Sequence, residues 1–124
     1  MKKYIKTILT ILLTAGIILF IEALLLRPQR LTIDSIHLHE ISDGEYIGIC
    51  QNKLLFAVVN VTVEDHIIQN IEILEHKESY LTQAYQIASD VIAKQSIDVD
   101  SVSHATLTSD TVLKAIENAL NREH

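Results

Sequence analysis

The stretch LLFAVVNVTVEDHIIQNIEILE, residues 54–75, decides the fold of this chain. Its first part, residues 54–63, is rich in β-branched residues and alternates towards its end, which is typical of a strand with one buried face. Its last part, residues 67–75, resumes the alternation. The inward-facing positions are expected to be Val59, Val61 and Val63 in the first part and Ile71 and Ile73 in the second. The two parts predict an antiparallel hairpin, although the polar segment between them lacks the glycine that a tight turn prefers.

The regions on either side of the hairpin complete the fold. A turn signal at residues 43–44 precedes residues 45–50, which alternate as a further strand. Apolar residues at spacings of three and four predict an amphipathic helix over residues 79–94 and a second helix at the C-terminus. The candidate N-caps of the second helix are Thr108, Ser109 and Asp110. We therefore expect an α+β fold, a small antiparallel sheet packed with two helices.

The N-terminal quarter has a different composition. Residues 7–26, TILTILLTAGIILFIEALLL, carry one charge, Glu22. Twenty residues of helix are about 30 Å long, which matches the hydrocarbon core of a bilayer, so this run predicts one N-terminal transmembrane helix. A buried globular helix would be shorter. A cleaved signal peptide is the other alternative, but the following LLLRPQR has no small-x-small cleavage pattern, which favours a retained anchor.

The flanking charges predict the orientation of this helix. Lys2, Lys3 and Lys6 precede it, whereas Arg27 and Arg30 follow it. The excess of positive charge before the helix favours a cytoplasmic N-terminus, residues 1–6. The chain is then a single-pass protein of the cell membrane with an extracytoplasmic domain. Residues 27–42 are expected to be a linker, of which residues 31–42 form either a short strand or an extended segment.

Charge and composition exclude several classes of function. From residue 27 onward the chain has seven Lys and Arg against fifteen Asp and Glu, a net charge of -8, so a nucleic-acid partner is not expected. The single cysteine, Cys50, excludes an internal disulfide and a CxxC pair, and is interpreted as a small hydrophobe in a strand. His37 and His39 can begin a metal site, but no third ligand follows, so they are interpreted as surface histidines.

The segment QSIDVDSVSHATLTS, residues 95–109, carries the chemistry. Several hydroxyl residues lie in it, directly before the last helix. The free backbone amides and the dipole at the start of a helix favour an anion, so residues 103–110 predict a site for a phosphate-bearing ligand. Ordinary helix capping is the alternative use of such a segment.

Part of this segment, DSVSHAT at residues 100–106, resembles the flavinylation motif of the FMN-binding domain family, which occurs in sodium-translocating NADH:quinone reductase and related electron-transport complexes. That motif reads approximately Asp-x-x-Ser/Thr-Gly-Ala-Thr. The matching positions are Asp100, Ser103, Ala105 and Thr106, and His104 stands in the place of the glycine. DGEYIG at residues 43–48 and LEHKES at residues 74–79 also resemble the family, so the likeness covers residues 43–121.

The resemblance implies a cofactor and an attachment point. The final threonine of the motif carries FMN through a phosphodiester bond, which implies attachment at Thr106 by a separate flavin transferase. The other implied cofactor-binding residues are Asp100, Ser103, His104, Ala105, Thr108 and His76. Candidate contacts of the flavin ring are Tyr46, Tyr80, Tyr85 and His76. The chain is then expected to be an electron carrier for a membrane or surface redox partner, and not a stand-alone enzyme.

Two other functions remain open at this point. The fold can serve as a binding or scaffold module that has lost the flavin. The histidine at position 104, in place of the glycine of the motif, is the reason to consider this function. It can also be a regulatory membrane module that senses a ligand.

Overall fold

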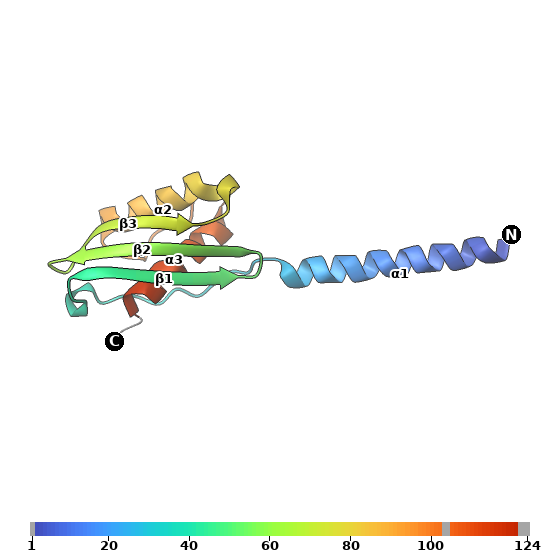
Figure 1. The fold of residues 1–124 in the computed structure, drawn as a ribbon, viewed down its shortest axis with the longest axis horizontal. Helices are drawn as coiled ribbons and strands as arrows, with labels where there is room; N and C mark the ends of the chain where they lie inside the picture. The colour runs from blue at the N-terminus through green and yellow to red at the C-terminus, as the bar shows by residue number, and fades with distance from the viewer. Residues whose placement is uncertain (1, 103–104, 122–124) are drawn as a thin grey trace.

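The structure is a computed structural model, and it describes residues 2–102 and 105–121. It contains one long N-terminal helix, a three-stranded sheet and two further helices (Figure 1). The elements are α1 (Lys2–Leu26), β1 (Gly44–Asn52), β2 (Leu55–Glu64), β3 (Ile67–Glu75), α2 (Leu81–Lys94) and α3 (Thr106–Asn121). Two short 3-10 turns, Leu38–Glu40 and Glu78–Tyr80, precede β1 and α2. The predicted α+β fold with an N-terminal apolar helix is confirmed.

The sheet is an antiparallel meander in the order β1-β2-β3. The predicted inward-facing residues are confirmed, since Val59, Val61 and Val63 are at most 1% exposed and Ile71 and Ile73 are 6% exposed. The β2–β3 turn has positive φ angles at Asp65 (53°) and His66 (63°), the geometry that glycine usually provides in a two-residue hairpin turn. The backbone amide of Asp65 donates to an Asp43 carboxylate oxygen at 2.8 Å, which supports this turn.

The two C-terminal helices cover one face of the sheet. The helix α3 packs across β1 and β2, and α2 packs against β3 and α3. The helix α3 approaches β1 closely at Gly48, where an added Cβ would lie 1.9 Å from the carbonyl oxygen of Ala115. Glycine at position 48 therefore allows the helix to lie directly on the strand. Among the described residues, no helix covers the opposite face of the sheet (Figure 1).

Both helices begin at other residues than the sequence predicted. The predicted start of α2, at roughly residue 79, lies in the 3-10 turn, and the α-helix itself begins at Leu81. The helix α3 begins at Thr106, so the prediction of an N-cap at residues 108–110 is wrong. The reason is local, because the Ser109 hydroxyl donates to the Ala105 carbonyl at 2.8 Å and accepts the Val102 amide at 3.0 Å. Ser109, in the first turn of α3, thus hydrogen-bonds the residues that precede the helix.

The helix α1 is long and apolar enough to cross a membrane. It has 25 residues, a mean hydropathy of 2.6 over its most apolar window and no buried residue. The hydroxyls of Thr7, Thr10 and Thr14 each donate to the carbonyl four residues earlier, at 3.1, 2.8 and 2.8 Å. Their polar groups are therefore satisfied within the helix, as a hydrocarbon environment requires.

Residues 27–42, here called the strap, lie along α3 and have no regular structure apart from the 3-10 turn at Leu38–Glu40. Ile41 is 1% exposed, and four further apolar side chains of the strap pack against the core. Gln29 pairs with the side chain of Asn52 through both its backbone groups, at 2.9 and 2.6 Å. The segment expected to be a linker is therefore joined to the domain from its third residue onward.

Candidate functional site

A cavity of about 520 Å³ lies where the β1–β2 turn, the β3–α2 connection and the first turn of α3 meet. Its lining residues come from four separate parts of the chain: Arg27, Pro28, Leu54, Leu55, Lys77, Tyr80, Ala105, Thr106, Leu107 and Thr108. The β1–β2 turn is at the end of the sheet nearest α1 (Figure 1). The cavity is therefore at the end of the domain that adjoins the N-terminal helix.

Thr106 is the first residue of α3 and lies in the wall of this cavity. Its side chain is half-buried, while the neighbouring Ala105 is 4% exposed and its amide donates to the Val102 carbonyl at 3.0 Å. The first amides of a helix have no partner within the helix and carry a partial positive charge. The Thr106 hydroxyl is thus at the start of a helix, a position that favours an anionic group.

Two basic residues, Arg27 and Lys77, also line the cavity. The Lys77 ammonium lies over the Tyr80 ring, 5.6 Å from its centroid, which is within cation–π range. Sequence reasoning considered Arg27 only for membrane orientation and did not single out Lys77. Lys77 follows His76 in the segment that resembles the family, which was an available signal, whereas no local pattern links Arg27 to residues 105–108.

His76 connects the sheet to the first turn of α3. Its Nδ1 is 2.9 Å from the Phe56 carbonyl and its Nε2 is 3.4 Å from the Thr108 hydroxyl. Because a carbonyl only accepts, Nδ1 carries the proton, and in the neutral ring Nε2 accepts from Thr108. Burial lowers the pKa of His76, partly offset by the hydrogen bond to Phe56. The ring is therefore neutral near pH 7, and it fixes the direction of the buried Thr108 hydroxyl.

A second cavity of about 620 Å³ adjoins the first. The two cavities share Leu54 and Lys77 in their walls, and the second also contains His76, Phe56 and Tyr85. The predicted site residues Thr106, Ala105, Thr108 and His76 are therefore brought together, and the candidate ring contacts Tyr80 and Tyr85 each line one of the two cavities.

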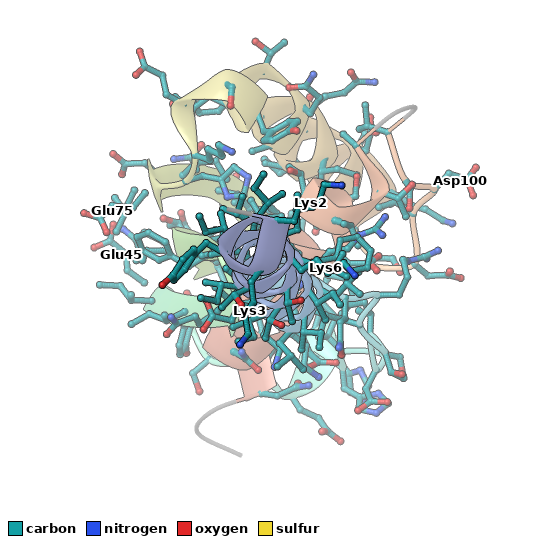
Figure 2. All side chains as sticks on the ribbon, turned by 90° about the vertical axis from the view of Figure 1, so that its right-hand side faces the viewer. Lys2, Lys3, Lys6, Glu45, Glu75 and Asp100 are labelled. Atoms are coloured by element: carbon teal, nitrogen blue, oxygen red, sulfur yellow. The ribbon has the colours of Figure 1, made fainter. Side chains whose placement is uncertain are left out.

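Two other predicted residues lie elsewhere. Asp100 lines a separate hollow with Asp90 and Lys94, and Figure 2 shows it pointing outward, away from α1. Tyr46 is near the start of β1, where its hydroxyl donates to the Ser42 carbonyl at 2.6 Å, and it lines neither cavity. The predictions for Ser103 and His104 lie outside the described residues.

Three buried polar residues hold the strap beside the site. Sequence reasoning did not single out Asn52 and Glu117, and it considered Asp110 at the start of the last helix but not as a contact of the strap. Asp110, 4% exposed, accepts from the Arg30 side chain at 2.6 Å and from the Leu31 amide at 3.0 Å. Glu117 accepts the amide of Asp34, and Asn52 pairs with Gln29. Asp110 and Glu117 are seven residues apart, so they lie on one face of α3, and that spacing within an otherwise buried stripe was the available signal.

The remaining residues considered in the sequence are Cys50, His37 and His39, and they lie outside the two cavities. Cys50 is 7% exposed and burial raises the pKa of its thiol, which agrees with its interpretation as a small hydrophobe in a strand. The His37 and His39 rings are 6.0 Å apart in an edge-on arrangement. Across residues 2–102 and 105–121, no group of three His, Cys, Asp or Glu side chains is placed to hold a metal ion.

Comparisons with known proteins give the family of this chain. A family model described as FMN-binding domain matches residues 56–121, which extend from β2 to the end of α3. A protein of Treponema pallidum (strain Nichols), described as an uncharacterized protein, is 29% identical over 86 residues. This similarity covers 67% of the chain and 24% of that relative, so the chain spans about a quarter of its length.

Proposed function

The chain belongs to the FMN-binding domain family, and on that premise we propose that it is a membrane-anchored electron-transfer protein that carries FMN covalently on Thr106. The helix α1 is the anchor, and the domain faces the extracytoplasmic side. The main support for this proposal is the position of Thr106, which is the first residue of α3 and lines a cavity.

The residues around Thr106 fit a flavin. A cavity of about 520 Å³ is within the usual range for small-molecule sites, about 300–1,000 Å³. Leu54, Leu55 and Leu107 provide apolar walls for a planar ring, and Tyr80 provides an aromatic face. The helix start, with Arg27 and Lys77, provides positive charge for a phosphodiester, which has one negative charge.

The proposed attachment transfers the FMN part of FAD to Thr106 and consumes no water. A P–O bond forms between the Thr106 oxygen and the phosphorus of the FMN part of FAD, while the pyrophosphate bond of FAD breaks. AMP leaves, and the hydroxyl proton is lost. This step is assigned to a separate flavin transferase, and Thr106 supplies only the nucleophile.

The chain's own residues hold the cofactor and shape its surroundings. When bound, FMN supplies the one- or two-electron redox chemistry. Lys77 and Arg27 balance the phosphate charge, and His76 holds the Thr108 hydroxyl in the first turn of α3. The electrons are exchanged with a redox partner at the membrane, and covalent attachment prevents the loss of the flavin outside the cytoplasm.

The attachment is tested by mass spectrometry of the full chain made together with a flavin transferase. We expect the peptide that contains Thr106 to gain the mass of one FMN minus water. The Thr106→Val variant keeps the size of the side chain and removes the nucleophile, so it should lack the adduct and the flavin fluorescence. Ser101→Ala, which removes an exposed hydroxyl five residues earlier, is the matched control and should keep both.

An unmodified Thr106 peptide under these conditions would contradict the proposal. If the purified protein also retains no flavin non-covalently, the scaffold or regulatory function becomes the better account of this chain.

A further inference from the structure

The face of the sheet opposite the helices is apolar at its centre. Four large side chains on this face are 41–54% exposed: Ile47, Ile49, Phe56 and Leu74. Val58, half-buried, is paired with Ile49 across β1 and β2 and completes the group. We call these five residues the apolar strip. Contiguous exposed apolar side chains, in contrast to single scattered ones, mark binding surfaces.

The charge on the same face has one sign. The three strands contain four glutamates, Glu45, Glu64, Glu72 and Glu75, all of them exposed, and no Lys or Arg. Glu45 and Glu75 point away from the sheet on the side opposite Asp100, as Figure 2 shows. The nearest basic residues in the sequence, Lys53 and Lys77, are beyond the ends of the strands.

This charge decides which occupant fits. A second copy of the chain placed face to face would bring two acidic rims together, and like charges across an interface are unfavourable. An anionic lipid surface would be repelled for the same reason. We therefore propose that this face is the docking surface for a protein partner with an apolar centre and a rim of Lys and Arg.

The geometry of the face fits a transient complex. Strands of nine residues are about 30 Å long, and three strands about 4.8 Å apart make a narrow surface. Such a surface is at the small end of protein interfaces, where weak and short-lived complexes are found. Phe56 and Leu74 also line the second cavity, so a partner on this face would lie beside the candidate flavin site.

The proposal is tested by placing a photoreactive benzoylphenylalanine at position 49 of the full chain, in membranes of cells that make it. The matched control carries the same group in place of Thr82, which is exposed on α2. We expect a protein adduct from position 49 and not from position 82. Raising the salt from about 0.1 to about 1 M shortens the Debye length from about 10 to about 3 Å, so the adduct should weaken strongly.

A charge variant tests the acidic rim. Glu45→Gln combined with Glu72→Gln should reduce the adduct by about threefold, since it removes two exposed charges. Glu40→Gln combined with Asp98→Asn removes two exposed charges away from the face and should leave the adduct unchanged. The Thr106→Val variant should also keep the adduct, so loss of flavin and loss of docking are distinguishable. An adduct with lipid alone, with a second copy, or with no dependence on salt and the face glutamates would overturn the proposal, as would the absence of an adduct.

Discussion

At the scale of the residue, His76 is a side chain that links two elements beside the candidate site. It hydrogen-bonds the Phe56 carbonyl of β2 and the Thr108 hydroxyl of α3, although it follows β3 in the sequence. Thr108 is 2% exposed, so its hydroxyl has few other possible partners. The imidazole thus holds the first turn of α3, which contains Thr106, in a fixed position relative to β2.

The protonation of His76 should couple stability to pH. Burial lowers the pKa of His76 in the folded protein, so the unfolded chain binds the proton more tightly in the interval below pH 6.5. The stability of the folded state is therefore full above pH 6.5 and decreases as the pH falls through that value.

The His76→Asn variant isolates this effect, because its amide keeps a donor for the Phe56 carbonyl and does not titrate. We expect urea unfolding of the full chain in detergent to show a wild-type advantage above pH 6.5 that shrinks at lower pH. The other histidines contribute equally to both proteins. A difference between the two proteins that is the same at every pH would contradict the coupling.

At the scale of the element, the contact between α3 and β1 depends on the absence of a side chain at Gly48. An added Cβ would meet the Ala115 carbonyl at 1.9 Å and the Ala119 amide at 2.6 Å, and both are backbone atoms. A backbone atom cannot rotate away, so α3 itself would have to move from the strand. The same helix carries Thr106 at its first residue, so this packing also positions the candidate site.

Gly48→Ala should therefore lower the free energy of unfolding by about 3 kcal/mol, the size of a severe overpacking effect. Gly16→Ala is the matched control, because no atom lies within 4 Å of a Cβ at that position in α1. Chemical denaturation of both variants in detergent measures the difference. Equal stability of the two variants would show that α3 does not lie on β1 at this distance.

At the scale of the whole molecule, the candidate site adjoins the end of α1. Arg27 and Pro28 line the cavity, and Gln29 is already paired with Asn52. Three residues span at most about 11 Å, so the cavity must be close to the point where α1 ends. If α1 spans a membrane as we propose, the flavin lies near the membrane surface.

The proposed orientation gives a labelling pattern. A membrane-impermeant maleimide should label a Thr82→Cys variant on intact cells, because residue 82 is exposed on α2. A Tyr4→Cys variant, in the predicted cytoplasmic end, should be labelled only after the membrane is opened. The native Cys50 gives little background, since it is buried and its thiol pKa is raised. The reverse labelling pattern would place the domain in the cytoplasm.

The sequence by itself determined the elements and the attachment candidate. The two-residue alternation of residues 54–63 and 67–75 sets which side chains are inward, and the spacing of residues 81–92 sets the face of α2, because both depend only on local backbone geometry. The apolar run at residues 7–26 identified the N-terminal helix by length alone. The motif at residues 100–106 identified the family, which the match over residues 56–121 confirmed.

Only the tertiary structure decided what surrounds Thr106. Arg27, Leu54 and Lys77 are far from it in the sequence, and they meet at the cavity because the strap, the β1–β2 turn and the β3–α2 connection end at the same edge of the domain. The spacing of Asp110 and Glu117 places them on one face of α3, but their hydrogen bonds to the strap became visible only when α3 was placed beside it. Such contacts depend on packing between distant segments, which no local pattern of residues encodes.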